Sequence, residues 1–213
     1  MNGKKGCFIT FEGPEGAGKS TQVKLLQQAL AQRGLECVLT REPGGTPLAE
    51  QLRNIVKYHE GDELMAAETE LLLFAASRAQ HVRNLIKPAV ADGKVVLCDR
   101  FYDSTTAYQG YARNLELDFI NRLNDFASAG CRPDLTILLD LPPEAGFSRT
   151  AVREETQGLN DRLENEALDF HLAVRAAFLT IAEQEPERVK VVSALDAPDE
   201  IHRNIMELLN NVI

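Results

Sequence analysis

Residues 13–20 have the composition and spacing of a phosphate-binding loop. The segment Gly13-Pro14-Glu15-Gly16-Ala17-Gly18-Lys19-Ser20 matches the pattern GxxxxGK(S/T), between a run typical of a strand and one typical of a helix. Glycine lets backbone N–H groups wrap a phosphate closely, and the helix N-terminus adds a favourable dipole. We expect Lys19 to reach the β- and γ-phosphates of a nucleotide and Ser20 to join the shell of a Mg²⁺ ion. The motif predicts nucleotide binding but leaves the reaction open, since GTPases and ATPases share it.

Two charged residues, Asp99 and Arg100, follow the apolar run Val95–Cys98, which we interpret as a strand. In open α/β sheets, ligands bind at the carboxyl ends of the strands. An aspartate there can hold Mg²⁺ through water or accept hydrogen bonds from a phosphate-binding group, and an arginine can hold phosphate bidentately. The alternative, a surface ion pair after a strand, fits less well beside a phosphate-binding loop.

A second set of polar and aromatic residues could bind an acceptor. Residues 40–46 (TREPGGT) have the composition of a turn, and Glu42 within it follows another predicted strand at the same sheet edge. Phe74 and Arg78 are four residues apart and share a helix face, so the ring could stack on a base and the guanidinium could donate to a base carbonyl. Helical phenylalanines are more often core residues, and that alternative stays open. The other candidates are Pro43, Arg53, Ser104, Thr105, Tyr108 and Gln109.

Apolar runs of strand length alternate with helical stretches along the chain. We expect strands at Cys7–Phe11, Cys37–Thr40, Val95–Cys98, Leu135–Asp140 and Val189–Val192. Helices are expected at Lys19–Arg33, Leu48–Val56, Ala66–Asp92, Leu115–Ala129, Ala167–Glu183 and Asp199–Leu209. Thr46 should cap the second helix, and Pro88 should interrupt the third. The alternation predicts an α/β protein with three layers (α/β/α) and a five-stranded parallel sheet, in one domain spanning residues 1–213.

Composition limits the partners that the protein can have. The formal net charge of −9 argues against nucleic acid and anionic membranes, because both require clustered cations. No run approaches about 18 apolar residues, and the first residues lack the features of a signal peptide, so we expect no membrane span and no secretion. The cysteines (Cys7, Cys37, Cys98 and Cys131) form no CxxC pair, which indicates reduced thiols in a cytoplasmic protein.

Several segments follow the pattern of one family in order and spacing. They are FEGPEGAGKST (11–21), TREPGGT (40–46), LLFAASRAQH (72–81), DRFYDSTTAYQG (99–110), RPDLTILLD (132–140) and NDRLENE (160–166). On these segments the chain resembles the bacterial thymidylate kinases, and REPGGT together with AYQG is specific among P-loop kinases. The resemblance implies transfer of the γ-phosphoryl group of ATP to dTMP with Mg²⁺ as cofactor, small-molecule substrates only, and a homodimer.

The resemblance also implies roles for single residues on the acceptor side. Phe74 would stack on thymine, Arg78 would bond its O4, and Thr105 would lie near the edge of the base. Arg53 and Arg100 would hold the phosphate of dTMP. The remaining contacts to dTMP would come from Glu42, Pro43, Ser104, Tyr108 and Gln109, with Tyr108 excluding a ribose 2′-hydroxyl.

On the donor side, residues 13–21, up to Thr21, would bind ATP together with Arg149. Ser20 and Asp99 would hold the metal. The polar stretch Arg153–Asn165 is typical of a mobile surface segment and resembles the lid of the family, at about 149–165, with arginines at 149, 153 and 162. The loop Ala194–Pro198 would line the adenine pocket. The expected catalytic residues are Lys19, Arg100, Arg153 and Glu15, the last lying near the sugar 3′-hydroxyl.

Two positions depart from the pattern of the family. Phe101 stands where many relatives carry Tyr, and Ser77 where many carry Asp, which bears on substrate preference more than on activity. Other interpretations remain open: a kinase for another nucleoside monophosphate or for a nucleoside, or a P-loop binding protein without kinase activity. A nucleoside kinase would not need two arginines for an acceptor phosphate, and the chain lacks the NKxD motif of GTPases.

Overall fold

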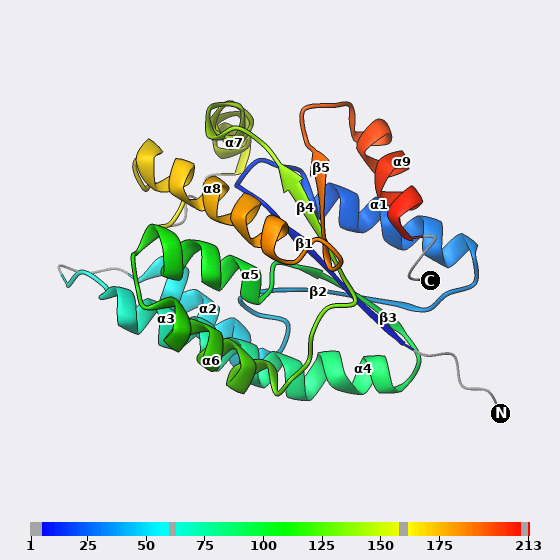
Figure 1. The fold of residues 1–213 in the computed structure, drawn as a ribbon, viewed down its shortest axis with the longest axis horizontal. Coiled ribbons are helices and arrows are strands. Elements are labelled where there is room, and N and C mark those ends of the chain that lie inside the picture. The colour runs from blue at the N-terminus through cyan, green and yellow to red at the C-terminus, as the bar shows by residue number, and fades with distance from the viewer. Residues whose placement is uncertain (1–5, 60–62, 158–161, 210–212) are drawn as a thin grey trace.

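The computed structural model describes residues 6–59, 63–157, 162–209 and 213, and for residues 151–157 it describes only the backbone. Its strands form one parallel sheet in the order β2-β3-β1-β4-β5 (Figure 1). The strands are β1 (Cys7–Glu12), β2 (Cys37–Arg41), β3 (Val95–Asp99), β4 (Leu135–Asp140) and β5 (Val189–Ser193). The predicted parallel sheet is confirmed. Each predicted strand is confirmed too, with a carboxyl end that agrees to within one residue.

One face of the sheet is covered by α1 (Lys19–Gln32) and α9 (Pro198–Leu209), which pack on each other. Leu26 and Leu30 of α1 and Ile205 and Leu209 of α9 belong to the same buried core as the strand residue Ile9. Helical spacing places these leucines and isoleucines on one side of each helix, so the sheet buries both apolar stripes.

The other face is covered by α8 (Leu168–Gln184) and by the segment α4 (Lys87–Ala91) with the π-helix η1 (Val82–Ile86) before it. Three more helices lie beside this segment (Figure 1): α2 (Pro47–Tyr58), α3 (Ala67–His81) and α6 (Leu117–Ser128), with α3 packed against both α2 and α6. The helix predicted at 66–92 is therefore α3, η1 and α4 in continuous succession. The interruption expected at Pro88 appears as the π-helical stretch that precedes it.

Local signals explain how α2 begins. The Thr46 hydroxyl oxygen accepts a hydrogen bond from Ala49 N at 3.3 Å, and Pro47 is the first residue of the helix. The predicted cap is confirmed. Because α2 is fixed directly after the turn 40–46, its side chains are held near the carboxyl end of β2.

Two helical segments were not predicted. One is α5 (Tyr102–Thr105), continued by the π-helix η2 (Thr106–Ala112), and the other is α7 (Pro143–Gln157). The segment Arg153–Asn165, expected to be a mobile surface segment, begins within α7, which extends to Gln157. Few apolar residues recur at helical spacing in α7, so periodicity gave no signal.

The register of the strands brings the site together. Phe11 of β1 and Arg41 of β2 both pair with Asp99 of β3, so the carboxyl ends of three strands are level. The cysteines in the described residues are free thiols, with Cys7 and Cys98 buried. Within the same residues, no helix combines the length and apolar character needed to cross a membrane.

Candidate active site

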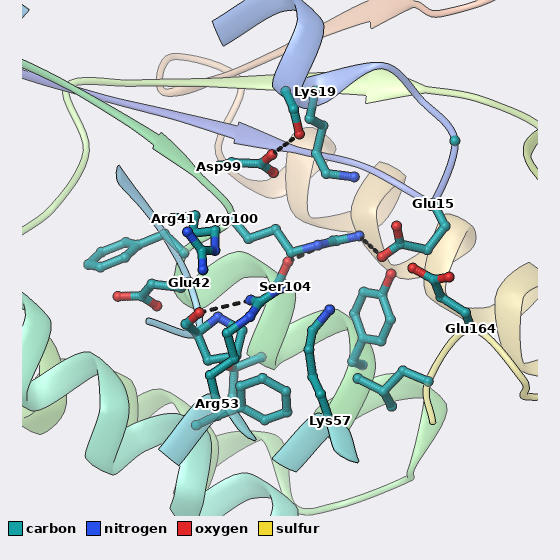
Figure 2. Close-up of a pocket in the computed structure, with 18 of the residues that line it drawn as sticks. Glu15, Lys19, Arg41, Glu42, Arg53, Lys57, Asp99, Arg100, Ser104 and Glu164 are labelled. Carbon is teal, nitrogen blue, oxygen red and sulfur yellow. Dashed lines mark hydrogen bonds and ion pairs between the residues drawn. The ribbon is translucent and has the colours of Figure 1, made fainter. Parts of the chain in front are cut away.

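A cavity of about 670 Å³ lies at the carboxyl ends of β1, β2 and β3. Figure 2 shows side chains from the phosphate-binding loop, from α2 and from the segment after β3 pointing into it. Most predicted site residues line this cavity: Glu15, Gly16, Gly18, Lys19, Ser20, Thr21, Glu42, Pro43, Arg53, Phe74, Arg78, Asp99, Arg100, Ser104, Thr105, Tyr108, Gln109 and Arg149. The structure thus brings donor-side and acceptor-side candidates to one cavity.

Two glycines of the loop, Gly13 and Gly18, show why the loop needs this residue type. Gly13 has a φ of 135°, and a Cβ there would lie 2.3 Å from the carbonyl oxygen of Leu139 in β4. Gly18 has a φ of 86° and leads directly into α1, with nothing within 4 Å of its Cβ position. The loop therefore packs tightly against the sheet at Gly13. At Gly18 no other atoms cover the backbone, which leaves room for a ligand.

The Lys19 side chain is folded into the loop and is 7% exposed. Its Nζ donates hydrogen bonds to the carbonyl oxygens of Gly13 (3.0 Å) and Pro14 (2.8 Å). Burial and the charge of Arg100 lower the pKa of Lys19, while Glu15 and Asp99 oppose the shift. Backbone carbonyls are weaker partners for an ammonium than phosphate oxygens, so Lys19 is available to an anion in the cavity.

Ser20 and Asp99 form a pair of oxygen ligands beside the loop. The Ser20 hydroxyl donates to Asp99 Oδ2 at 2.6 Å, joining the start of α1 to the end of β3. Magnesium prefers hard oxygen ligands and usually keeps water and phosphate in its shell, so a hydroxyl and one carboxylate fit it. In the part of the chain that the structure describes, no cluster of three or more His, Cys, Asp or Glu could hold a metal.

Arg100 adopts an unusual backbone conformation with a φ of 70°, where non-glycine residues are rare. Its Nη1 donates to the Gly13 carbonyl oxygen (3.0 Å) and to Ser104 Oγ (3.1 Å), and its Nη2 donates to Glu15 Oε1 (2.5 Å). The guanidinium also lies over the Tyr108 ring, 5.2 Å from its centroid. Strained backbone that is held on several sides often marks a functional position.

Glu15 faces the same cluster from within the loop. Burial opposes ionisation, but the charges of Arg100, Lys19 and Lys57 hold the pKa of Glu15 well below its usual range. The carboxylate is therefore ionised at neutral pH. It partly neutralises a group of cations that would otherwise repel one another at the centre of the cavity.

Glu12 is a buried carboxylate that sequence analysis did not select. It is the last residue of β1, and Oε1 accepts from Phe101 N at 2.7 Å while Oε2 accepts from Ser104 Oγ at 2.6 Å. Burial and nearby Asp103 raise its pKa to about 7, against the effect of Arg100 and the hydrogen bonds. The signal in the sequence was a glutamate at the end of an apolar strand, directly before the glycine-rich loop.

Arg78 lies on the acceptor-side wall and is 1% exposed. Its nitrogens donate to Glu42 Oε2 (2.8 Å), Asn124 Oδ1 (2.9 Å) and Thr105 Oγ1 (2.9 Å). Each Nη also carries a second hydrogen, so Arg78 can still donate to a ligand. Phe74 lies one turn earlier on α3 and lines the cavity, so the predicted pair shares the wall as expected.

Glu42 supports that wall from β2's end of the sheet. Besides Arg78, it contacts His81 Nδ1 at 3.0 Å, and His81 Nε2 lies 2.6 Å from Thr40 Oγ1. His81 is fully buried and was not selected from the sequence. The sequence feature that points to His81 is its place three residues after Arg78, which puts both side chains on the same face of α3.

Two cations of α2 reach the cavity. Arg53 Nη1 donates to the Pro43 carbonyl oxygen at 2.9 Å, and Lys57 lies one turn further along α2 and also lines the cavity (Figure 2). Lys57 was missed, although its i,i+4 spacing from Arg53 was visible in the sequence. These cations, together with Arg100, give the acceptor side a positive surface despite the acidic chain.

Gln109 and the C-terminal border of the predicted lid meet at one buried carboxylate. Glu70 is fully buried, and its Oε1 accepts from Gln109 Nε2 at 2.7 Å. Arg162 and Arg113 both donate to the same carboxylate. Arg162 does not line the cavity, so the structure places it in an ion-pair network between α3 and η2.

Arg149 connects the loop to the segment after β5. Its guanidinium donates to the carbonyl oxygens of Gly16 (3.2 Å) and Ala194 (3.0 Å). The side chain of Arg153 and residues 158–161 lie outside the described residues. The predicted role of Arg153 and the predicted lid therefore stay predictions.

The departures from the family pattern have local partners. Ser77 is buried, accepts from Gly44 N at 3.1 Å and donates to the Ala49 carbonyl oxygen at 3.4 Å. Phe101 packs edge-on against Phe8 with centroids 5.0 Å apart, beneath Arg78. The residues of the cavity wall that were missed are Lys24, Arg41, Lys57, Tyr58, Phe101, Thr150, Leu163 and Glu164.

A parallel sheet with a glycine-rich loop between β1 and α1, and a cationic cavity beside it, defines a P-loop nucleotide-binding protein. The model of the family described as thymidylate kinase matches residues 11–205, and the chain belongs to this family. It is 49% identical over 203 residues to the thymidylate kinase of Rhodopseudomonas palustris (strain TIE-1), covering 95% of this chain and 88% of the relative. It is 50% identical over 208 residues to that of Pseudomonas putida (strain GB-1), covering 98% and 97%.

Solved structures agree with the sequence comparison. The crystal structure of thymidylate kinase from Ehrlichia chaffeensis superposes with a TM-score of 0.78 at 33% identity. The match covers 96% of this chain and 98% of that one. The similarity therefore extends over the whole fold, including the helices that carry the acceptor-side wall.

Proposed function

We propose that the protein transfers the γ-phosphoryl group of ATP to dTMP, giving ADP and dTDP. The observation that carries the proposal is one cavity that joins the phosphate-binding loop to the wall formed by Phe74 and Arg78. A phosphate oxygen of dTMP attacks the γ-phosphorus of ATP, and the bond from that phosphorus to the β-phosphate oxygen breaks. Membership of the thymidylate kinase family supports this choice of substrates.

On the donor side, residues 13–21 bind the phosphates of ATP. Lys19 exchanges the carbonyls of Gly13 and Pro14 for the β- and γ-phosphates, where the contact between opposite charges is stronger. Arg149, which joins the loop to Ala194, borders the adenine side. Ser20 and Asp99 would hold a Mg²⁺ ion, which supplies charge neutralisation on the phosphate oxygens when bound.

On the acceptor side, Arg53 and Arg100 hold the phosphate of dTMP. Phe74 stacks on thymine, and Arg78 donates to O4 with a hydrogen that its protein partners leave available. Tyr108, whose ring packs under Arg100, borders the sugar, and Glu15 lies near the 3′-hydroxyl. The remaining contacts come from Glu42, Pro43, Ser104, Thr105 and Gln109.

Catalysis rests on positioning and on charge neutralisation, because the acceptor phosphate is already anionic and needs little help from a general base. Lys19 and Arg100 flank the phosphoryl group in transfer. A lid at about 149–165 brings Arg153 to the same group and excludes water, which would otherwise hydrolyse ATP. Arg162, held by buried Glu70, anchors the C-terminal border of that lid.

The protein works in the cytoplasm as a homodimer. Helices α3 and α6 lie side by side, and each exposes large apolar side chains: Leu72 on α3, with Phe119 and Phe126 on α6. Phe126 is 73% exposed, and adjacent apolar side chains on a surface favour an interface. Light scattering after size exclusion should give a dimer for the wild type and a monomer for Phe126→Asp. A monomeric wild type would contradict this part of the proposal.

The test of the function is ADP release coupled to NADH oxidation, with Mg-ATP and dTMP, dUMP, AMP, CMP or dGMP offered separately. We expect release that depends on dTMP and is weaker with dUMP. Activity confined to another monophosphate would keep the phosphate-binding assignments and overturn those for the base. Folded protein that binds ATP but shows no acceptor-dependent release would overturn the kinase assignment itself.

A further inference from the structure

Glu12 belongs neither to the phosphate-binding loop nor to the wall of the cavity, so the proposed function gives it no role. It ends β1 directly before Gly13, and its side chain is fully buried. Burying a carboxylate is costly unless hydrogen bonds compensate for the lost water. Among the residues that the structure describes, the hydrogen bonds of the Glu12 side chain all go to one short segment, the residues that follow Arg100.

These hydrogen bonds fix the beginning of α5. Glu12 Oε1 accepts from the backbone N–H groups of Phe101 (2.7 Å) and Ser104 (3.3 Å), and Oε2 accepts from the Ser104 hydroxyl (2.6 Å). Glu12 satisfies the N–H group of Phe101, which directly precedes the helix, and shares that of Ser104 with the Phe101 carbonyl oxygen (3.2 Å). The segment after β3 is thereby tied to the end of β1.

The same contacts hold the backbone of Arg100 from both sides. Its own N–H donates to the Phe11 carbonyl oxygen at 2.9 Å, and the next N–H, that of Phe101, donates to Glu12. The two consecutive residues of β1 thus bind the two peptide groups that flank Arg100. A φ of 70° costs about 1 kcal/mol for a residue with a Cβ, so such a conformation persists only where its surroundings impose it.

Glu12 also reaches the guanidinium of Arg100 through Ser104. The Ser104 hydroxyl donates to Glu12 Oε2 and accepts from Arg100 Nη1 at 3.1 Å. Orienting the hydroxyl hydrogen toward Glu12 leaves a lone pair of Ser104 Oγ for Arg100. One buried carboxylate therefore controls both the backbone and the side-chain direction of this arginine.

We propose that Glu12 is a positioning residue of the reaction, which aims Arg100 at the acceptor phosphate through Phe101 N and the Ser104 hydroxyl. The inference rests on the role of Arg100 in the proposed function. Glu12 touches no substrate itself, because it lies behind Arg100 and is not part of the cavity wall. Its loss should affect the acceptor far more than ATP.

The test uses Glu12→Met, which keeps the length of the side chain and removes every hydrogen bond. We expect kcat/KM for dTMP to fall about 10- to 100-fold, as expected when a catalytic group is misplaced by about 1 Å, while KM for ATP stays within about twofold. Glu12→Gln keeps an acceptor for Phe101 N and a polar group toward Ser104, so it should recover most of the loss. Asp134→Asn, which alters a carboxylate bound to Phe8 N at the other end of β1, serves as control and should match the wild type.

A double-mutant cycle separates positioning from general damage. In an Arg100→Met background, Glu12→Met should cause little further loss, because it acts through the missing arginine. The proposal would be overturned if the two substitutions reduced kcat/KM for dTMP independently, so that their fold-losses multiplied. An equal loss of kcat/KM for ATP and for dTMP would overturn it as well. If Glu12→Met does not fold, Ser104→Ala tests the same relay. It should raise KM for dTMP less in the Arg100→Met background, where only the direct contact of Ser104 with dTMP is lost.

The outcomes also distinguish this inference from the proposed function. Wild-type protein without dTMP-dependent ADP release, or Arg100→Met with normal kcat/KM for dTMP, would show that the function or the role of Arg100 is wrong, and the inference would fall with it. A large loss in Arg100→Met combined with an unchanged Glu12→Met would overturn the inference alone.

Discussion

Replacing Glu42 by glutamine should destabilise the fold although the side chain keeps its shape. The Glu42 and Arg78 side chains are 3% and 2% exposed and joined at 2.8 Å, and Glu42 also contacts His81. The amide can still accept from Arg78, and His81 can accept from the new NH₂ group if its proton lies on Nε2, toward Thr40. The substitution therefore removes a charge and leaves the hydrogen-bond pattern largely intact.

The expected cost follows from that difference. Breaking a buried ion pair costs about 3–5 kcal/mol, and replacing a charged hydrogen bond by a neutral one costs about 1–2 kcal/mol. Glu42→Gln should therefore lower the free energy of unfolding by roughly 2–4 kcal/mol. In the double variant with Arg78→Met, the buried cation that Glu42→Gln leaves unpaired is gone. The double variant should therefore lose less free energy of unfolding than the sum of the two single variants, by about 1–3 kcal/mol.

Equilibrium unfolding in urea at fixed protein concentration, followed by far-ultraviolet circular dichroism, measures these energies in a chain without tryptophan. Glu50→Gln is the matched control, because Glu50 pairs with Arg41 at 2.9 Å on the surface. Its cost should stay below about 1 kcal/mol. The reasoning fails if Glu42→Gln costs no more than this control, or if the two buried substitutions are additive.

Three further results are expected. Lys19→Met should lower kcat about 10²–10³-fold, because one positive charge beside the transferring phosphoryl group is lost. Its melting temperature should stay near that of the wild type. Near-normal turnover in the ADP-release assay would exclude the role assigned to Lys19. Arg153→Ala should lower kcat more than it weakens dTMP binding measured by calorimetry, whereas an equal loss in both would argue against contact with the transition state. Burial and Asp103 raise the pKa of Glu12 from 4.5 to about 7, against Arg100, so its stabilising contribution is present below about pH 4.5 and is lost as the pH rises through about 7. The free energy of unfolding of the wild type relative to Glu12→Gln should thus fall by up to roughly 3 kcal/mol between pH 5 and 8, and a constant difference over this range would show that Glu12 titrates normally.

The arrangement of the cavity explains how an acidic protein can bind two polyanionic substrates. Arg53, Lys57 and Arg100 line one cavity, and the carboxylate of Glu15 partly neutralises the charges of Lys57 and Arg100. A small phosphate needs only such a local concentration of cations. The overall charge of −9 therefore limits macromolecular partners without limiting the ligand.

Sequence by itself determined the sheet and the phosphate-binding loop. The central strands β1, β3 and β4 are buried on both faces and have continuous apolar sequences, while the edge strands β2 and β5 are partly exposed. Glycine tolerates the backbone angles found at Gly13 and Gly18, so the loop too can be recognised from local sequence. The pairing of Phe74 with Arg78 was also local, because i,i+4 spacing fixes a shared helix face. The resemblance to a family added roles that spacing alone does not define.

Only the tertiary structure decided which polar residues share an environment. Glu12 and Ser104 are separated by 92 positions, as are Arg162 and Glu70, and nothing local relates them. Parallel strand register brings β1 beside β3 and so places Glu12 against α5, and the fold brings Arg162, in the turn before α8, to buried Glu70 of α3. Burial depends on all neighbours at once, so the raised pKa of Glu12 and its hold on Arg100 could not be read from residue type or spacing.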